Sequence, residues 1–444
     1  MIALPKGSKK LIMAWATYDL ANSVYNLVIT ATIFPIYYNA VTTSKDASGK
    51  ILSETVNFLG FNFKNSALYE YAIAFAYLIV AILSPLLSGV ADYGGSKKKF
   101  MKIFCYLGAT ACLLMYFFDK DTVSLGIILA VLACVGFSGS MVFYNAYLPE
   151  IAAPEQQDAV SAKGFAMGYW GSSILLIVNL MMVQKPEWFG LSNAGQATKI
   201  AFLSVGLWWA GFAQIPFYYL PEGKRKDGNR TTFIKGYQEL AKVWGELKHN
   251  MQLKRFLVAF FVYSMGVQTV MLVATLFGSK EIKDADGNGM DTGKLITVIL
   301  IIQFVAMAGA YLFSFLSRKK GNLFTLKTAT LFWVIVCIGT YAFVYTPAHF
   351  YMVAVCVGLV MGGIQSLSRS TYSKMLPETK DHTSYFSFYD VCEKLSIVFG
   401  MLCFALITEN SSTMRTPILA LIVFFVFGFL LLLRIPKMQE QNSH

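Results

Sequence analysis

One apolar stretch near the N-terminus carries side chains that could bind a polar solute or a proton. Residues 11–38 are long and apolar enough, at about 20 residues per span, to cross a bilayer. On a helix with about 100° per residue, a few of its polar and aromatic side chains share one narrow face. They are Trp15, Asp19, Asn22 and Asn26, with Tyr18 beside them. An acid and two amides are costly in lipid, so this face should meet protein or a water-filled cavity.

Asp19 is the first candidate for chemistry because it has no opposite charge on its own predicted helix. Isolated acids inside membrane spans mark substrate or proton pathways, so we expect Asp19 to bind a solute or a proton. Polar side chains on other apolar runs could line the same cavity. They are Tyr144, Asn145, Tyr169, Gln268, Gln303, Gln365, Arg369, Tyr389, Asp390 and Lys394.

Three of these charged candidates also have a structural interpretation. Asp390 and Lys394 are four residues apart, a spacing that allows a local ion pair on one helix. Arg369 lies near the end of its run, from where its side chain could extend to the membrane surface. If the residues are instead functional, Asp19 could bind an amino group and Lys394 or Arg369 a carboxylate. The sequence leaves both interpretations open.

The composition predicts an all-α membrane protein. The chain has 444 residues, of which 56% are hydrophobic and 14% charged, with a mean hydropathy of +0.54. A soluble fold of this length could not cover so much apolar surface. We expect twelve transmembrane helices, since lipid offers no partner for free backbone groups. The runs are about 11–38, 69–90, 100–118, 123–147, 162–183, 198–219, 255–278, 294–317, 323–345, 349–372, 384–407 and 413–434.

The distribution of charge sets the expected orientation. Most of the 37 lysines and arginines fall in segments on the same side as both chain ends, which predicts that both termini are cytoplasmic. The net charge of +12 is therefore a topology signal, and we expect no nucleic-acid partner. The seven cysteines lie in apolar stretches without a CxxC pair, so neither a metal site nor a disulfide is expected.

Sequence echoes divide the chain into two six-helix pseudo-repeats. Leu-Pro-Glu ends both the fourth run, at 148–150, and the tenth, at 376–378. The long segment between the sixth and seventh runs includes an apolar pattern at helical spacing, which predicts an amphipathic helix. Two parallel repeats are the arrangement of a rocking transporter. The predicted units are 1–220, the linker 221–254, and 255–444.

The loop after the second run resembles the signature loop of the major facilitator superfamily, roughly G-x-L-A-D-R-x-G-R-K. Asp92, Gly95 and Lys97 match, whereas Tyr93 and Ser96 depart from the usual arginines. The resemblance implies the major facilitator fold and a loop that latches the two halves on the cytoplasmic side. The gating residues it implies are Asp92, Gly95, Lys97, Lys98 and Arg318. In the equivalent second loop a serine stands in the place of the acid, so we expect a weaker latch there.

The opening stretch, W-x-x-Y-D-x-A-N-S-x-Y, resembles the "unknown major facilitator" branch, which is related to fungal vacuolar amino-acid efflux proteins. Further matching pieces are 144–150, 161–169, 266–270 and 362–370. Many members of that branch carry an aspartate where this chain has Met265, which affects proton coupling at that position. The resemblance implies a small polar solute, with amino-acid efflux as the first hypothesis.

No enzyme signature or Gly-rich phosphate loop is present, so we expect a secondary transporter without a cofactor, coupled to protons or another ion. Export of a sugar or a drug-like solute is the alternative substrate hypothesis. A non-transporting receptor or scaffold is the alternative of another class. The expected partners are a small-molecule solute and the lipid bilayer, with the protein a monomer. Short loops and the lack of a targeting extension favour a bacterial inner membrane.

Overall fold

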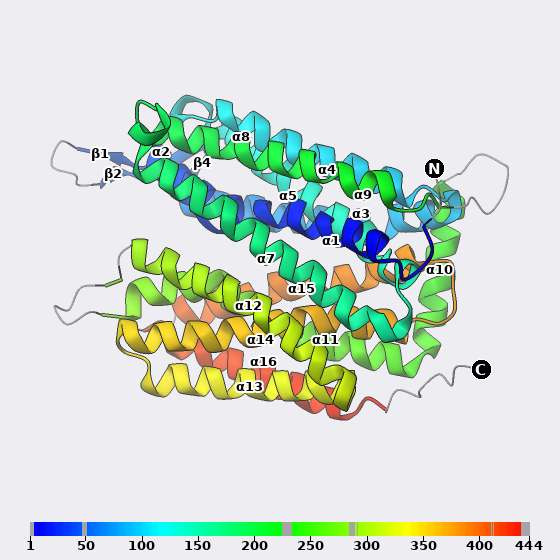
Figure 1. Ribbon diagram of the computed structural model, residues 1–444. Helices are drawn as coiled ribbons and strands as arrows, with labels where there is room; N and C mark the ends of the chain where they lie inside the picture. The colour runs from blue at the N-terminus through cyan, green and yellow to red at the C-terminus, as the bar shows by residue number, and fades with distance from the viewer. Residues whose placement is uncertain are drawn as a thin grey trace.

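The computed structural model describes residues 4–46, 51–223, 233–283, 289–290, 292–409, 411 and 413–436. Long helices dominate it (Figure 1). Eleven helical segments of the described chain are long and apolar enough to cross a membrane, which confirms a multi-pass helical membrane protein. A further helix of 31 residues, α11, lies alongside them.

The N-terminal part of the chain forms a first bundle. Its first segment is continuous from α1 through the π-helical η1 to α2, and short helices follow several of the longer ones. The long elements are α1 (Lys9–Val24), η1 (Tyr25–Ile33), α2 (Phe34–Thr42), α3 (Asn65–Gly94), α4 (Lys97–Leu114), α5 (Val123–Asn145), α7 (Pro154–Gln184) and α8 (Ala194–Phe212). The short ones are η2 (Met115–Phe117), η3 (Lys120–Thr122), α6 (Leu148–Ile151), η4 (Pro186–Phe189) and α9 (Gln214–Tyr219).

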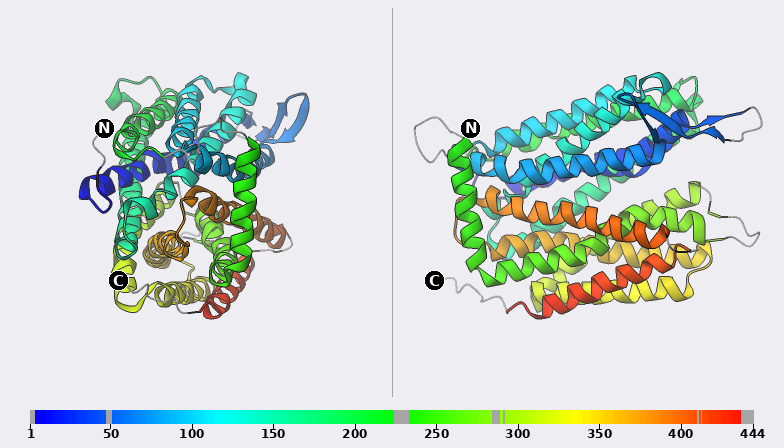
Figure 2. Two further views of the ribbon diagram at one scale, coloured as in Figure 1. Left: turned by 90° about the vertical axis from the view of Figure 1, so that its right-hand side faces the viewer. Right: turned by 180° about the vertical axis from the view of Figure 1, so that it is seen from behind.

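The C-terminal part forms a second bundle, preceded by a helix that stands apart. That helix, α10 (Phe233–His249), runs across one end of the molecule, beside both bundles (Figures 1 and 2). The elements of the second bundle are α11 (Met251–Glu281), α12 (Thr292–Lys320), α13 (Asn322–Phe343), α14 (Pro347–Met375), α15 (His382–Glu409) and α16 (Thr416–Leu433).

Two antiparallel strand pairs after α2 are a detail that the sequence did not predict. β1 (Ser44–Lys45) pairs with β2 (Ile51–Ser53), and β3 (Thr55–Phe58) pairs with β4 (Phe61–Lys64). They lie at the end of the molecule opposite α10 (Figure 1). We call that end the strand end, and the end that carries α10 the linker end.

Each bundle has its own apolar core. The buried residues of one hydrophobic cluster run from Leu11 to Leu220, and those of the other run from Val243 to Ile435 with Ala146 and Tyr169 added. Between the bundles, α7 packs on α12 and α14, while α15 packs on α3 and α5. The two bundles are visible as upper and lower layers in Figure 1. Any residue on the facing sides of these helices can therefore contact both bundles.

Candidate solute-binding and gating site

A buried ion pair joins the two bundles. The Arg369 guanidinium, on α14, lies with its Nη1 3.2 Å from Oδ2 of Asp19 on α1. Arg369 is 1% exposed and Asp19 is 3% exposed, so the pair is enclosed by protein. This burial rules out the interpretation in which Arg369 extends to the membrane surface. The acid without a partner on its own helix thus finds one 350 positions away along the chain.

Further hydrogen bonds connect this pair to the first bundle. Arg369 donates from Nε to Oγ of Ser161 and from Nη2 to the Ser161 carbonyl, both at 2.9 Å, and its Nη1 lies 3.3 Å from Oδ1 of Asn145. The Tyr144 hydroxyl donates to Asp19 at 2.7 Å. Buried charges are stable when they are paired and hydrogen-bonded in this way. The candidates Asp19, Tyr144, Asn145 and Arg369 therefore form one cluster.

Aromatic rings surround the guanidinium. Trp15 and Tyr144 stack with their ring centroids 4.5 Å apart, and the Trp15 indole donates to the Tyr144 carbonyl at 3.0 Å. The Arg369 guanidinium carbon lies 4.8 Å from the Trp15 ring and 4.2 Å from the Phe165 ring. Aromatic faces attract cations at such distances. Phe165 belongs to α7 and is a member of the site that the sequence analysis missed.

Gly164 provides the space for the ion pair. A Cβ atom at this position would lie 2.4 Å from the Asp19 carboxylate and 2.9 Å from Arg369 Nη2. Only a residue without a side chain leaves α7 close enough to α1 for this contact. The small residues of α7 therefore position the charged cluster as well as the helices.

A second charged cluster lies on α15. Lys394 Nζ is 2.8 Å from Oε2 of Glu393 and 3.4 Å from Oδ1 of Asp390. The i,i+4 pair expected from the sequence is present, but Glu393 is the nearer partner. Ser84 of α3 donates to Asp390 at 3.3 Å, so this cluster also contacts the first bundle. Glu393 was not among the candidates from the sequence because its neighbours along the helix already offered a complete pair.

Beside the two clusters lies a small, partly polar cavity of about 20 Å³, enough for about one water. Its lining combines amides, hydroxyls, aliphatic groups and aromatic rings with one carboxylate, that of Glu393. The other residues that line it are Phe165, Phe260, Tyr263, Ser264, Val267, Gln268, Ile364, Gln365, Ser368 and Tyr389. Tyr169, from the first bundle, does not line the cavity but donates its hydroxyl to Oε1 of the lining residue Gln365.

Four candidates from the sequence lie away from this cavity. Tyr18 packs against Tyr144 and Phe217 inside the first bundle. Asn22 donates to the Met141 sulfur within the same bundle. Asn26 is half-buried in the π-helical turn, and the buried Oε1 of Gln303, on α12, accepts no hydrogen bond from the described residues.

The predicted gating loop contacts α15 at the linker end. Asp92, near the end of α3, accepts hydrogen bonds from the backbone amides of Ser384 at 2.7 Å and Thr383 at 3.2 Å. These amides belong to the first turn of α15, where a helix favours negative charge. Gly95 ends α3 with φ +59°, a left-handed conformation that suits glycine. The contact of Asp92 with a helix N-terminus matches the one implied by the resemblance.

The lysines after this loop bind other groups at the same end. Lys97 pairs with Glu150, which in turn lies 3.1 Å from Nδ1 of His382. Lys98 donates to the Leu220 carbonyl at 2.8 Å. Arg318, in the last turn of α12, is exposed and lies over the Phe315 ring. Among the described contacts, Arg318 therefore makes none that would join the bundles.

A second latch exists that the sequence did not reveal. Asp158, in the first turns of α7 and 1% exposed, accepts from Ser317 Oγ at 2.8 Å and from Asn322 Nδ2 at 2.7 Å. The third group that contacts the Asp158 carboxylate is Lys374, whose Nζ lies 2.7 Å from Oδ2. The acid that the second loop lacks is thus supplied by the first bundle. The available sequence signal for this latch was the position of Asp158, an acid just before the apolar run 162–183.

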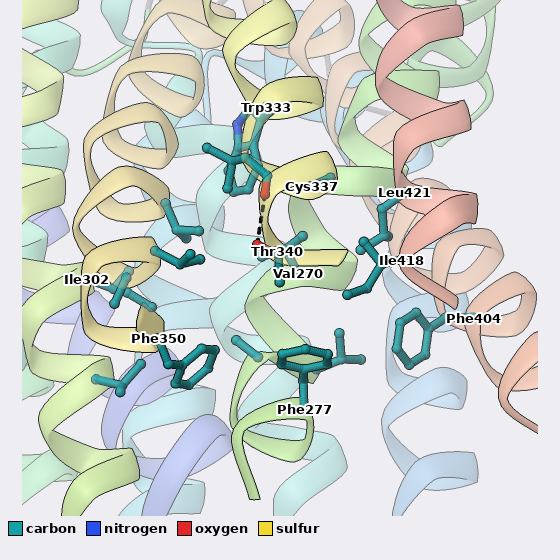
Figure 3. Close-up of a pocket in the computed structure, with 17 residues that line it drawn as sticks. Val270, Phe277, Ile302, Trp333, Cys337, Thr340, Phe350, Phe404, Ile418 and Leu421 are labelled. Carbon is teal, nitrogen blue, oxygen red and sulfur yellow. Dashed lines mark hydrogen bonds between the residues drawn. The ribbon is translucent and has the colours of Figure 1, made fainter. Parts of the chain in front are cut away.

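A cavity inside the second bundle is a different kind of space. Its volume is about 60 Å³, and its lining is almost wholly apolar (Figure 3). Trp333 and Cys337 of α13, Phe277 of α11 and Phe404 of α15 are among its walls. The Thr340 hydroxyl, at its edge, donates to the Val336 carbonyl of its own helix. Such a lining offers a polar solute no partners, which separates this cavity from the inter-bundle site.

The fold is that of the major facilitator transporters. A transporter of that superfamily, FucP, solved in the outward conformation, superposes with a TM-score of 0.67 at 12% identity, covering 97% of this chain and 98% of that one. The proton:xylose symporter XylE gives a TM-score of 0.68 at 13% identity, over 96% of this chain and 95% of that one. At such low identity the likeness concerns the fold alone.

The sequence comparisons define the family. Residues 7–443 match the model of the family described as "Vacuole effluxer Atg22 like", and the chain belongs to it. The uncharacterized MFS-type transporter YxiO of Bacillus subtilis is 30% identical over 97% of both chains. Autophagy-related protein 22 of Kluyveromyces lactis is 27% identical over 81% of this chain and 77% of that one. The resemblance inferred from the motifs is thereby confirmed, and a transporter family rather than an enzyme family is indicated.

Proposed function

We propose that this protein is a secondary active transporter that carries a small polar solute, an amino acid in the first place, by alternating access. The observation that carries the proposal is the buried Arg369–Asp19 pair, which joins the bundles next to a polar cavity. An amino acid bears one ammonium and one carboxylate. When the bundles separate, the carboxylate of such a solute can replace the partner that Arg369 loses. The family description as a vacuole effluxer supports efflux as the direction.

The architecture proposed for this function has twelve spans in two parallel six-helix repeats. The eleven candidate spans together with α11 supply that number. The proposed units remain 1–220 and 255–444, joined by the linker 221–254, and rocking of one against the other opens each side in turn. We further propose that a monomer of this kind resides in a bacterial inner membrane. The coverage of the Bacillus relative over 97% of both chains supports that location.

We propose an orientation with both chain ends and the linker end in the cytoplasm, which the distribution of lysines and arginines supports. In this orientation the latches of Asp92 and Asp158 lie on the cytoplasmic side and hold it closed. Asp19 is the residue we propose for coupling to a proton or another ion, because Met265 stands where the resemblance implies an acid. No cofactor is required.

Solute counterflow in proteoliposomes tests the function. Vesicles containing the purified chain are loaded with one unlabelled amino acid, and entry of the labelled form is followed; sugars and dipeptides are tested in parallel. We expect counterflow of amino acids, and we expect Asp19→Asn to abolish it while the protein still inserts and stays monodisperse. Lys199→Gln, which removes an ion pair at the strand end, is the matched control.

The outcomes separate the hypotheses. If sugars or drug-like solutes show counterflow and amino acids do not, the protein is still a transporter but its proposed substrate class is wrong. The absence of counterflow for every solute, with folded protein in the vesicles, would favour a receptor or scaffold. Unchanged amino-acid counterflow in Asp19→Asn would remove Asp19 from the mechanism.

A further inference from the structure

The charges on α15 do not balance within the contacts that the structure describes. Lys394 is the cation that contacts two carboxylates, those of Glu393 and Asp390. Two other buried inter-bundle acids each have one cationic partner, Arg369 for Asp19 and Lys374 for Asp158. An extra negative charge in the interior of a membrane protein is costly. A cationic group that arrives from outside would relieve that cost.

The two carboxylates of this cluster have different surroundings. The Asp390 side chain is 2% exposed, and it is held by Lys394 on one oxygen and by Ser84 of α3 on the other. The Glu393 side chain is 28% exposed and lines the inter-bundle cavity. Its contacts are Lys394 and a long hydrogen bond of 3.4 Å from Gln268. A carboxylate has about four acceptor positions, so Glu393 keeps capacity for a ligand in the cavity.

A second polar group lines the same cavity. Ser264 lies on the same face of α11 as Gln268 and is 4% exposed. A hydroxyl oxygen can accept hydrogen bonds, as can a carboxylate. The Ser264 hydroxyl and the partly free Glu393 carboxylate therefore offer acceptors in one small space to a ligand with hydrogen-bond donors.

We propose that Glu393 binds the primary ammonium group of the transported solute, with Ser264 and the amide of Gln268 beside it. This inference rests on the proposed transport function and deepens it, because it defines the substrate class as primary amines, amino acids among them. An ammonium has three donors and one positive charge, which match one carboxylate, neighbouring oxygens and the surplus charge of the cluster.

The rest of the lining favours an organic ammonium over a metal ion. Tyr389 and Phe260 stack with ring centroids 4.2 Å apart on one side of the cavity, and Phe165 lies on the other bundle. Aromatic rings attract ammonium groups and pack against the carbon atoms next to them. Among the residues described, no group of three or more His, Cys, Asp or Glu side chains could hold a metal. The site thus offers one anionic partner within an aromatic wall.

Lys394 would connect the binding of a ligand at Glu393 to the contact between the bundles. That lysine is shared between the cavity carboxylate and Asp390, which bonds to Ser84 of the first bundle. A ligand cation on Glu393 competes with Lys394 for that carboxylate and leaves Lys394 to Asp390. The occupied site is in this way connected to one contact that must break when the bundles rock.

Thermal melting of the full-length protein in detergent tests the assignment. The probes are L-alanine, L-leucine and L-glutamine, each with its N-acetyl derivative, together with propylammonium chloride and sodium chloride at equal ionic strength. We expect at least one free amino acid and propylammonium to raise the melting temperature, and the N-acetyl derivatives and sodium not to. Glu393→Gln should weaken the apparent affinity about 10- to 100-fold, as expected for loss of a charged hydrogen bond.

Two further variants keep the result interpretable. Glu393→Asp retains the charge and should recover part of the affinity. Glu409→Gln removes the same charge from an exposed position near the end of α15 and should behave as the wild type. An amine response that persists in Glu393→Gln, or an equal response to sodium, would overturn the proposal, as would a lack of response to every amine in the wild type.

The failure of this inference can be told from the failure of the proposed function. Amino-acid counterflow with an unchanged KM in Glu393→Gln would leave the transporter assignment intact and remove Glu393 from the site. If propylammonium binds in a Glu393-dependent way but amino acids show no counterflow, the ammonium site is supported and the proposal of amino-acid transport is wrong.

Discussion

The two latches at the linker end reach the same result with opposite arrangements. In the first, the loop acid Asp92 lies at the end of α3 and takes two backbone amides from the start of α15. In the second, the loop position holds Ser317, and the acid Asp158 lies on the facing helix α7. In both cases the first bundle provides the carboxylate and the second bundle the donors. A latch therefore requires one acid at the interface, and this acid can belong either to the loop itself or to the helix that faces the loop.

The donors of the two latches differ in kind, and this should set their strength. Backbone amides at a helix start offer partial charges, whereas Lys374 offers a full charge to Asp158 with two neutral donors beside it. A buried acid with a full countercharge is more costly to disrupt than one with amide donors. We therefore expect the second latch, whose loop lacks the signature acid, to be the stronger one.

The largest effect should come from Asp158→Ala. It leaves Lys374, Asn322 and Ser317 without their acceptor, at a cost of about 3 kcal/mol to the closed linker end, or roughly a 100-fold shift in its population. Spin labels at the exposed positions 99 and 319 should report a longer distance between the bundles. An unchanged distance distribution would mean that this contact does not hold the linker end closed.

Moving the acid tests whether its side of the interface matters. Ser317→Asp alone places a second carboxylate beside Asp158, and the repulsion should open the linker end by roughly tenfold in population. The double variant Ser317→Asp with Asp158→Ser restores a single acid and should lie closer to the wild type than either single change. The same pair of spin labels measures all three variants. A double variant that is as open as the sum of the singles would contradict the comparison.

A smaller effect is expected for Asp92→Asn. The amide oxygen can still accept from Thr383 or Ser384, so the loss is confined to the attraction between the charge and the helix start, about 1 kcal/mol. The ratio of open to closed molecules in the label distances should rise about fivefold, well below the effect of Asp158→Ala. An equal or larger effect at Asp92 would reverse the proposed ranking of the latches.

The smallest effect is expected at the strand end, where Lys199 Nζ lies 2.6 Å from Oδ2 of Asp119. Both side chains are partly exposed to solvent, so Lys199→Gln should cost less than about 1 kcal/mol and leave the latch distances unchanged. The hydrogen bond from Lys199 holds the pKa of Asp119 below its usual range. Its stabilisation is therefore present above the unfolded pKa of about 3.9 and is lost as the pH falls through the lower folded value. Melting temperatures of wild type and variant across that range should converge at the acid end.

The sequence predicts the elements of this molecule better than it predicts their contacts. Hydropathy identifies the spans because lipid demands helices, and the loop around Asp92 is recognisable because its acid, glycine and lysine are adjacent in the chain. The partnership of Asp19 with Arg369 cannot be seen in this way, since the two residues lie 350 positions apart and meet only when α1 and α14 pack. Asp158 was hidden for the same reason, because its donors come from three other helices.

Spacing along one helix was also a poor guide to which acid faces the cavity. Asp390 and Lys394 have the favourable four-residue spacing, and this concealed Glu393 beside them. The exposure that distinguishes Glu393 from Asp390 depends on α3 and α11, which cover one side chain and leave the other open. Such a difference arises from packing between distant helices and has no local sequence signal.

The apolar cavity inside the second bundle has a volumetric consequence. Hydrostatic pressure favours states with less unfilled space between side chains, and the cavity of about 60 Å³ lined by Trp333, Phe277, Phe350 and Phe404 is such a space. Compression should therefore act first on the packing of α11, α13 and α14 in this bundle. The second bundle would then yield to pressure at a point well away from the latches.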